Sequence, residues 1–433
     1  MTNQGAASEA MTASRGSRPY FVLGALVAGL IAGMAAQQAG DGLREPALQA
    51  STLIGGLWLN GLKMTVIPLV VALLVTGVAA GAEAARAGKI AGRTVLWIVI
   101  LCTASSVFGA VTLKLLTGAF PLPTVQAQAM QTGLAGLDQS AASGPIPGAL
   151  EFFKGVVPGN VISAAANGDV LPLVVFALLF ALAVSRIEVK RRRTIVDLFE
   201  AIADALLIII GWVLWIAPLG VFALAFSVGA SAGGAAFAGL GHYILVISVI
   251  GVLVTLWAYP IVLVWGRTGI ATFSKAMISP QSVAISTRSS LASLPAMLGA
   301  ASSLGVREQV ADVTLPLAVA LFRATGPAMN TAVAFYVAHW LGYEPTVTQM
   351  IAATAVGAVM SYGAVSLPGE VSYISSIAPI AMALGVPIAP LALLVAVEMV
   401  PDIFRTLGNV TLDVAVATVV DRSVEAEQVA QRA

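Results

Sequence analysis

The sequence predicts an all-α polytopic membrane protein with eight transmembrane helices and two re-entrant helical hairpins. Hydrophobic residues make up 58% of its 433 positions and charged residues only 10%, with a mean hydropathy of +0.94. Soluble domains carry roughly 25% charged residues. Apolar segments long enough to cross a hydrocarbon core of roughly 30 Å recur along the chain. In the C-terminal third, two apolar segments of similar sequence are interrupted by Ser, Gly and Pro.

Several other classes of protein are excluded by composition. The net charge is +1 and no long basic run occurs, so no nucleic-acid partner is expected. The single cysteine, Cys102, excludes an intrachain disulfide framework. No nucleophile with a base and no set of metal ligands at recognisable spacing appears, so the chain is not predicted to be an enzyme or to hold an organic cofactor.

Residues 20–270 contain six clear spans, which follow a cytoplasmic N-terminal tail at 1–19. They begin near residues 20, 53, 93, 169, 202 and 241. Basic residues gather before the first span, after the second and after the fourth: Arg15 and Arg18; Arg86, Lys89 and Arg93; Arg186, Lys190, Arg191, Arg192 and Arg193. By the positive-inside rule these ends are cytoplasmic. A secretory signal is the alternative for the first span.

The C-terminal third is expected to repeat a unit of hairpin plus helix. The stretches 286–297 and 361–373, which carry Ser293-Leu294-Pro295 and Ser366-Leu367-Pro368, each interrupt an apolar segment whose two arms are too short to span alone. Polar backbone at membrane depth requires protein or a water-filled cavity around it, and paired broken segments indicate a transporter binding site. Surface loops between ordinary spans are the alternative. The expected elements are hairpin 1 at 271–306, transmembrane helix 7 at 311–342, hairpin 2 at 346–385, transmembrane helix 8 at 387–421 and a cytoplasmic tail at 422–433.

Helix 8 is predicted to carry a polar face. At 100° per residue, five polar side chains fall within an arc of about 80°: Glu398, Asp402, Arg405, Asn409 and Asp413. Each unsatisfied charge at the bilayer centre costs on the order of 2.5 to 3.5 kcal/mol, so this face needs a polar interior, either a substrate pathway or a buried ion-pair network. Pro401 is expected to kink the helix.

These residues resemble the dicarboxylate/amino acid:cation symporter family, which includes the glutamate transporters. The resemblance extends over nearly the whole chain. It is carried by LKMTVIPLVVALLVTGVA, NVISAAANGDVLPLVVFALLFALAV, IAPLGVFAL, the tip Arg288-Ser289-Ser290 and the run DIFRTLGNVTLD. It implies a glutamate-transporter-like homotrimer in a bacterial inner membrane, with both termini cytoplasmic and a substrate domain that moves against a fixed scaffold.

The resemblance also implies roles for individual residues. Asp402 matches the aspartate that binds the substrate's α-amino group, and Arg405 the arginine that pairs with its side-chain carboxylate. Asp413 matches a carboxylate that coordinates sodium. The remaining matches are substrate contacts on helix 8 and at the two hairpin tips: Thr406, Asn409, Ser289, Ser290, Gly363 and Gly369.

Helix 7 departs from the family pattern. The family signature there is Asn-Met-Asp-Gly-Thr, and an ungapped match places Phe322-Arg323-Ala324-Thr325-Gly326 at the same position. The asparagine and aspartate ligands are absent, which argues against multi-sodium coupling. Counting Arg323 and Arg288 with Glu398, Asp402, Arg405 and Asp413 gives a net charge of zero. Arg323 is therefore either a tethered cation near Asp413 or a second clamp for substrate.

The predicted function is secondary active symport of a small anionic solute, an acidic amino acid or a C4-type dicarboxylate. The coupling ion, H⁺ or Na⁺, is left open. Glu398 and Glu370 are candidate proton carriers, because a carboxyl group held away from water retains a proton more readily; Glu370 could instead face water. A membrane-embedded receptor for dicarboxylates, without transport, is the alternative function.

Overall fold

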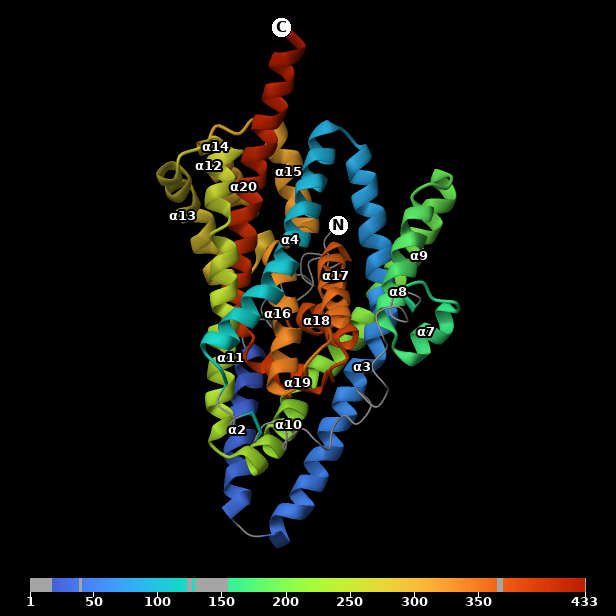
Figure 1. Ribbon diagram of the computed structural model, residues 1–433, viewed down its shortest axis with the longest axis vertical. Helices are drawn as coiled ribbons and strands as arrows, with labels where there is room; N and C mark the ends of the chain where they lie inside the picture. The colour runs from blue at the N-terminus through green and yellow to red at the C-terminus, as the bar shows by residue number, and fades with distance from the viewer. Residues whose placement is uncertain (1–17, 39–40, 123–126, 129–154, 364–368, 433) are drawn as a thin grey trace, which may run out of the picture.

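The computed structural model describes residues 18–38, 41–122, 127–128, 155–363 and 369–432. Regular structure in these ranges is entirely helical, which confirms the predicted fold class. The molecule is elongated, and most helices run close to its long axis (Figure 1).

The N-terminal region forms long apolar helices and shorter segments between them. Their bounds are α2 Arg18–Gln38, α3 Asp41–Arg86, α4 Lys89–Ala119, α7 Val161–Asn167, α8 Val170–Val184, α9 Val189–Trp215, α10 Ala217–Ala232, α11 Ala235–Thr255 and α12 Ala258–Val264. In the described chain, six helices are long and apolar enough to cross a membrane, and α8 and α10 are shorter apolar helices. The chain is therefore a multi-pass membrane protein.

Each predicted hairpin region contains two helices. In the first, α13 (Ile270–Thr287) is followed directly by α14 (Ser290–Ser303), and the two pack against each other. In the second, α17 (Val347–Gly363) packs against α18 (Gly369–Leu384). Residues 364–368, which include Ser366-Leu367-Pro368, lie outside the described part of the chain.

The segment predicted as one continuous helix at 311–342 is divided. α15 (Glu308–Leu321) ends before Phe322, and α16 (Thr325–Trp340) begins three residues later. Phe322 adopts an extended backbone conformation. The Ser105 hydroxyl of α4 donates a hydrogen bond to the Ala324 carbonyl. A side chain of another helix thus satisfies a backbone group that the break exposes, as a helix break at membrane depth requires.

Helix 8 is also interrupted, close to its proline. A short helix α19 (Ala389–Leu394) and a 3₁₀ turn (Val395–Val397) precede α20 (Met399–Arg432). Pro401 lies in the first turn of α20. A proline disrupts helical bonding at the residue four positions before it, here Val397, which is the last residue of that 3₁₀ turn. The disturbance expected from Pro401 thus falls at this interruption.

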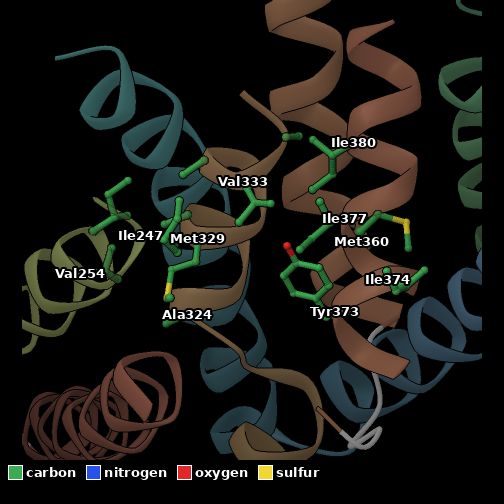
Figure 2. Packing of buried hydrophobic residues seen from close by; sticks show 14 of the residues in the cluster. Ile247, Val254, Ala324, Met329, Val333, Met360, Tyr373, Ile374, Ile377 and Ile380 are labelled. Atoms are coloured by element: carbon green, nitrogen blue, oxygen red, sulfur yellow. The ribbon is translucent and has the colours of Figure 1, made fainter. Parts of the chain in front are cut away.

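α20 is the central helix of the molecule. Of its most apolar window, 83% is buried inside the protein, compared with 17% for the peripheral helix α9. α20 packs against α11, α13, α14, α15 and α16. Figure 2 shows part of the surrounding core, in which Tyr373 and Ile377 of hairpin 2 lie on the side toward Met329 and Val333 of α16. The helix that carries the polar face is thus enclosed by protein.

Close helix contacts depend on glycine where α2 meets α10. A Cβ atom on Gly33 would lie 2.3 Å from the Phe226 carbonyl oxygen and 2.6 Å from the Ala230 nitrogen. Gly229 has the reciprocal contact, 2.3 Å from the Leu30 carbonyl oxygen. Small residues let helix backbones approach in this way in membrane proteins, where apolar burial between helices contributes little.

Gly33→Ala is expected to destabilise this helix pair. The added methyl group meets backbone atoms, which cannot rotate away, so we expect a loss of about 1 to 3 kcal/mol and a lower thermal midpoint in detergent. Gly24→Ala, on the same helix, is the matched control, because nothing among the described residues lies within 4 Å of its Cβ position. Equal midpoints for the two variants would contradict the contact.

Candidate functional site

A buried ion-pair cluster lies at the start of α20. Arg405 is 8% exposed, and its Nη1 atom lies 2.6 Å from Glu398 Oε1 and 3.5 Å from Asp402 Oδ1. Glu398 is 4% exposed. Three of the five residues predicted to share one helix face thus form one charged cluster, with two carboxylates against one guanidinium group.

Arg405 retains a free hydrogen-bonding edge. Its Nε and Nη2 atoms are buried and have no hydrogen-bond partner among the described residues. These two N–H groups point to the same side of the planar guanidinium, which is the geometry that receives both oxygens of one carboxylate. Buried donors without partners are costly. The edge can therefore receive an anionic group, which the described residues do not supply.

Hairpin 1 meets the cluster through its tip. Arg288 ends α13 in the left-handed backbone conformation, at φ 51°, and its Nη1 lies 4.0 Å from Asp402 Oδ2. Ser289 caps α14, where its hydroxyl oxygen accepts a hydrogen bond from the Ala292 backbone N–H, and Ser290 begins that helix. The structure thus brings the tip to the same carboxylate that approaches Arg405.

Asn409 and Thr406, further along α20, bond to protein groups. The Asn409 Oδ1 atom accepts from the backbone N–H of Thr325, at 3.0 Å, and lies 2.5 Å from its hydroxyl. That hydroxyl is also 2.6 Å from the Arg405 carbonyl oxygen, so its one proton serves one acceptor at a time. The Thr406 hydroxyl donates to the Asp402 carbonyl. Asn409 therefore fixes the start of α16, immediately after the break, against α20.

Asp413 is the most isolated charge of the predicted set. It is 0% exposed, and neither carboxylate oxygen has a hydrogen-bond partner among the described residues. Phe322 and Ala324, in the broken part of helix 7, offer no side-chain oxygen beside it. Arg323, between them, lies close enough to interact electrostatically with both Asp413 and Asp402.

Arg323 also contacts hairpin 2, through Nη1, which donates a 2.9 Å hydrogen bond to the Ser372 hydroxyl of α18. Gly363 is the last residue of α17, and Gly369 is the first residue of α18. Glu370 is in the first turn of α18, and its side chain lies outside the described part of the structure. Hairpin 1 therefore contacts Asp402 through Arg288, and hairpin 2 contacts Arg323 through Ser372.

Sequence reasoning missed two tyrosines at this centre. Tyr243 of α11 donates a 2.9 Å hydrogen bond to Glu398 Oε2, and its hydroxyl lies 3.0 Å from that of Tyr373 in α18. Both side chains are buried, at 0% and 1% exposed. No pattern in the sequence indicates this pair, because the two residues are 130 positions apart in different helices.

The chain matches a model of one protein family over most of its length. The model describes the sodium:dicarboxylate symporter family and aligns with residues 19–423.

Curated proteins of similar sequence carry names that agree with this match. A proton/sodium-glutamate symport protein of Bacillus subtilis is 27% identical over 85% of this chain and 85% of its own length. A C4-dicarboxylate transport protein of Leptothrix cholodnii is 26% identical over 93% of this chain and 87% of its own. A proton/glutamate-aspartate symporter of Escherichia coli is 23% identical over 91% and 90%.

Proposed function

Because the chain belongs to the sodium:dicarboxylate symporter family, we propose that it imports an acidic amino acid or a C4-type dicarboxylate by secondary active symport. The family consists of membrane transporters rather than enzymes. The similar proteins are named for glutamate, aspartate and C4-dicarboxylates, all of which carry two carboxylates. A small anionic solute with two carboxylates is therefore the proposed substrate class.

The observation that carries this proposal is the free edge of Arg405. Its buried Nε and Nη2 groups can receive a carboxylate bidentately, while Nη1 stays paired with Glu398. Asp402 would meet the α-amino group of an amino acid, and Ser289, Ser290, Thr406 and the hairpin ends at Gly363 and Gly369 would complete the site. Arg288 lies 4.0 Å from Asp402, and the substrate amino group would displace it from that carboxylate. A dicarboxylate would leave the Arg288 contact in place.

For coupling, we propose that Arg323 supplies the positive charge that bound sodium provides in sodium-driven relatives. The charges of Glu398, Asp402 and Asp413 are balanced by those of Arg405, Arg323 and Arg288 without any added cation. Asp413 has no hydrogen-bond partner among the described residues, and Arg323 interacts with it electrostatically. Glu398 and Glu370 are then the proposed proton carriers. A second substrate clamp at Arg323 is the competing proposal.

The proposed setting is a homotrimer in a bacterial inner membrane, with cytoplasmic termini and elevator-like movement of the substrate-binding part. The connection between α3 and α4 lies at the end of the molecule where α20 projects outward (Figure 1), and α3 ends at Arg86 and α4 begins at Lys89. Lys89 and Arg93 both pair with Glu427 near the end of α20, at 2.7 and 2.6 Å. This clustering of basic residues at one end supports the orientation.

Counterflow exchange in proteoliposomes tests the proposed function without any ion gradient. Vesicles preloaded with unlabelled succinate or L-aspartate should accumulate the labelled compound from outside, and empty vesicles should not. Vesicles without protein are the control. Binding of either compound to purified protein without exchange would instead identify a receptor.

A further inference from the structure

Tyr373 and Tyr243 form a buried hydrogen-bond chain that ends on Glu398. Tyr373 comes from hairpin 2, Tyr243 from α11 and Glu398 from the residue before α20. Figure 2 shows Tyr373 directed away from its own helix toward α16, surrounded by apolar side chains of the core. All three side chains are buried, and the two hydroxyl groups and Glu398 Oε2 form one continuous chain.

The order of donors along this chain is determined by the number of protons. Each hydroxyl carries one hydrogen. Tyr243 donates its hydrogen to Glu398 Oε2, so the bond between the tyrosines uses the hydrogen of Tyr373. Hairpin 2 therefore supplies the first donor, and Glu398 is the final acceptor.

Glu398 stands between this chain and Arg405. Its Oε2 atom is bound by Tyr243, and its Oε1 atom lies 2.6 Å from Arg405 Nη1. Asp402, on the same helix as Arg405, lies 3.5 Å from Nη1, and Arg323 also interacts electrostatically with Arg405. Glu398 thus contacts only one nitrogen of the guanidinium, and Nε and Nη2 have no hydrogen-bond partner among the described residues.

We propose that Tyr243 and Tyr373 are positioning residues of the transport site, which hold Glu398 on Nη1 and so keep the Nε and Nη2 edge of Arg405 open for the substrate carboxylate. The inference rests on the proposed function, because it assigns that edge to substrate. It also gives the second arm of hairpin 2 a direct route to the substrate-binding arginine. The tyrosines act through Glu398 and make no contact with substrate themselves.

Removing the Tyr243 hydroxyl should let Glu398 compete with the substrate for Arg405. Oε2 would lose its donor, and Nε and Nη2 of Arg405 are buried donors that have no partner among the described residues. Glu398 would then bind the guanidinium bidentately and compete for the edge that substrate needs. Tyr243→Phe should therefore raise the KM for uptake about tenfold, the scale of one hydrogen bond to a charged group, and lower the maximal rate much less.

Tyr373→Phe should change KM in the same direction by a smaller factor, because Tyr243 can still donate to Glu398. The double variant should equal Tyr243→Phe alone, since Tyr373 acts through Tyr243. Tyr336→Phe is the matched control. Its ring packs edge-on against Tyr243, with centroids 5.4 Å apart, but its hydroxyl lies 2.8 Å from His242 Nδ1. This variant should leave KM unchanged.

Infrared difference spectroscopy tests the positioning separately from transport. The Glu398 carboxyl band is identified by subtracting the spectrum of Glu398→Gln from that of the unmodified protein. Tyr243→Phe should shift this band, Tyr373→Phe should shift it less, and Tyr336→Phe should not shift it. An unshifted band in Tyr243→Phe would overturn the inference, as would a KM within twofold of the unmodified protein. A shifted band in a protein that exchanges neither succinate nor aspartate would retain the positioning and refute the proposed function.

Discussion

Arg405→Lys is expected to reduce uptake of labelled succinate or L-aspartate by at least about a hundredfold. The lysine ammonium can still pair with Glu398, but it has no planar fork, so the two parallel hydrogen bonds to a substrate carboxylate are lost. Hydrogen bonds to charged groups contribute about 1.5 to 3 kcal/mol each, and each 1.4 kcal/mol is tenfold in affinity. The measurement is the initial rate of uptake over a range of substrate concentrations in proteoliposomes.

Arg422→Lys provides the control for this prediction. Arg422 also lies on α20, is 37% exposed and pairs with Glu425 at 2.9 Å, so its replacement should leave uptake unchanged. If Arg405→Lys transported both substrates at rates near those of the unmodified protein, Arg405 could not be the carboxylate clamp.

Arg323→Ala is expected either to make uptake dependent on sodium or to abolish it. The substitution removes the positive charge near Asp413, which is 0% exposed and whose oxygens have no hydrogen-bond partner among the described residues. A buried carboxylate without compensation is strongly unfavourable. A bound sodium ion could replace the missing charge. The measurement is uptake with and without sodium. A fully active variant whose uptake does not depend on sodium would contradict the proposal that Arg323 is a tethered cation.

Arg323→Lys separates the two proposals for Arg323. Lysine retains the positive charge but not the bidentate fork. If Arg323 is a tethered cation, the lysine variant should keep sodium-independent uptake. If Arg323 is instead a second substrate clamp, Arg323→Lys should reduce uptake nearly as much as Arg323→Ala does.

The general architecture could be predicted because it depends on properties local in sequence. The low charge content and the long apolar segments identify membrane helices, and the spacing of Glu398, Asp402 and Arg405 places them on one helix face. The structure brings these three side chains together. The two interrupted apolar segments likewise coincide with the pairs α13 with α14 and α17 with α18.

The tyrosine pair could not be predicted, because its two residues are distant in sequence. The break in helix 7 does have a local signal, Gly326-Pro327, which the prediction of one continuous helix did not use. A proline disrupts helical bonding at the residue four positions before it, here Arg323. Ser105 of α4 and Asn409 of α20, which bond to Ala324 and Thr325, add contacts that no local pattern indicates.

Uptake under defined ion gradients is the most direct test of the account as a whole. Proteoliposomes should be given labelled succinate or L-aspartate under an inward sodium gradient, an inward proton gradient, or neither. We expect accumulation under the proton gradient in the complete absence of sodium, since Arg323 already balances the charge of Asp413. A strict requirement for sodium would contradict the tethered cation and would mean that sodium finds other ligands around Asp413.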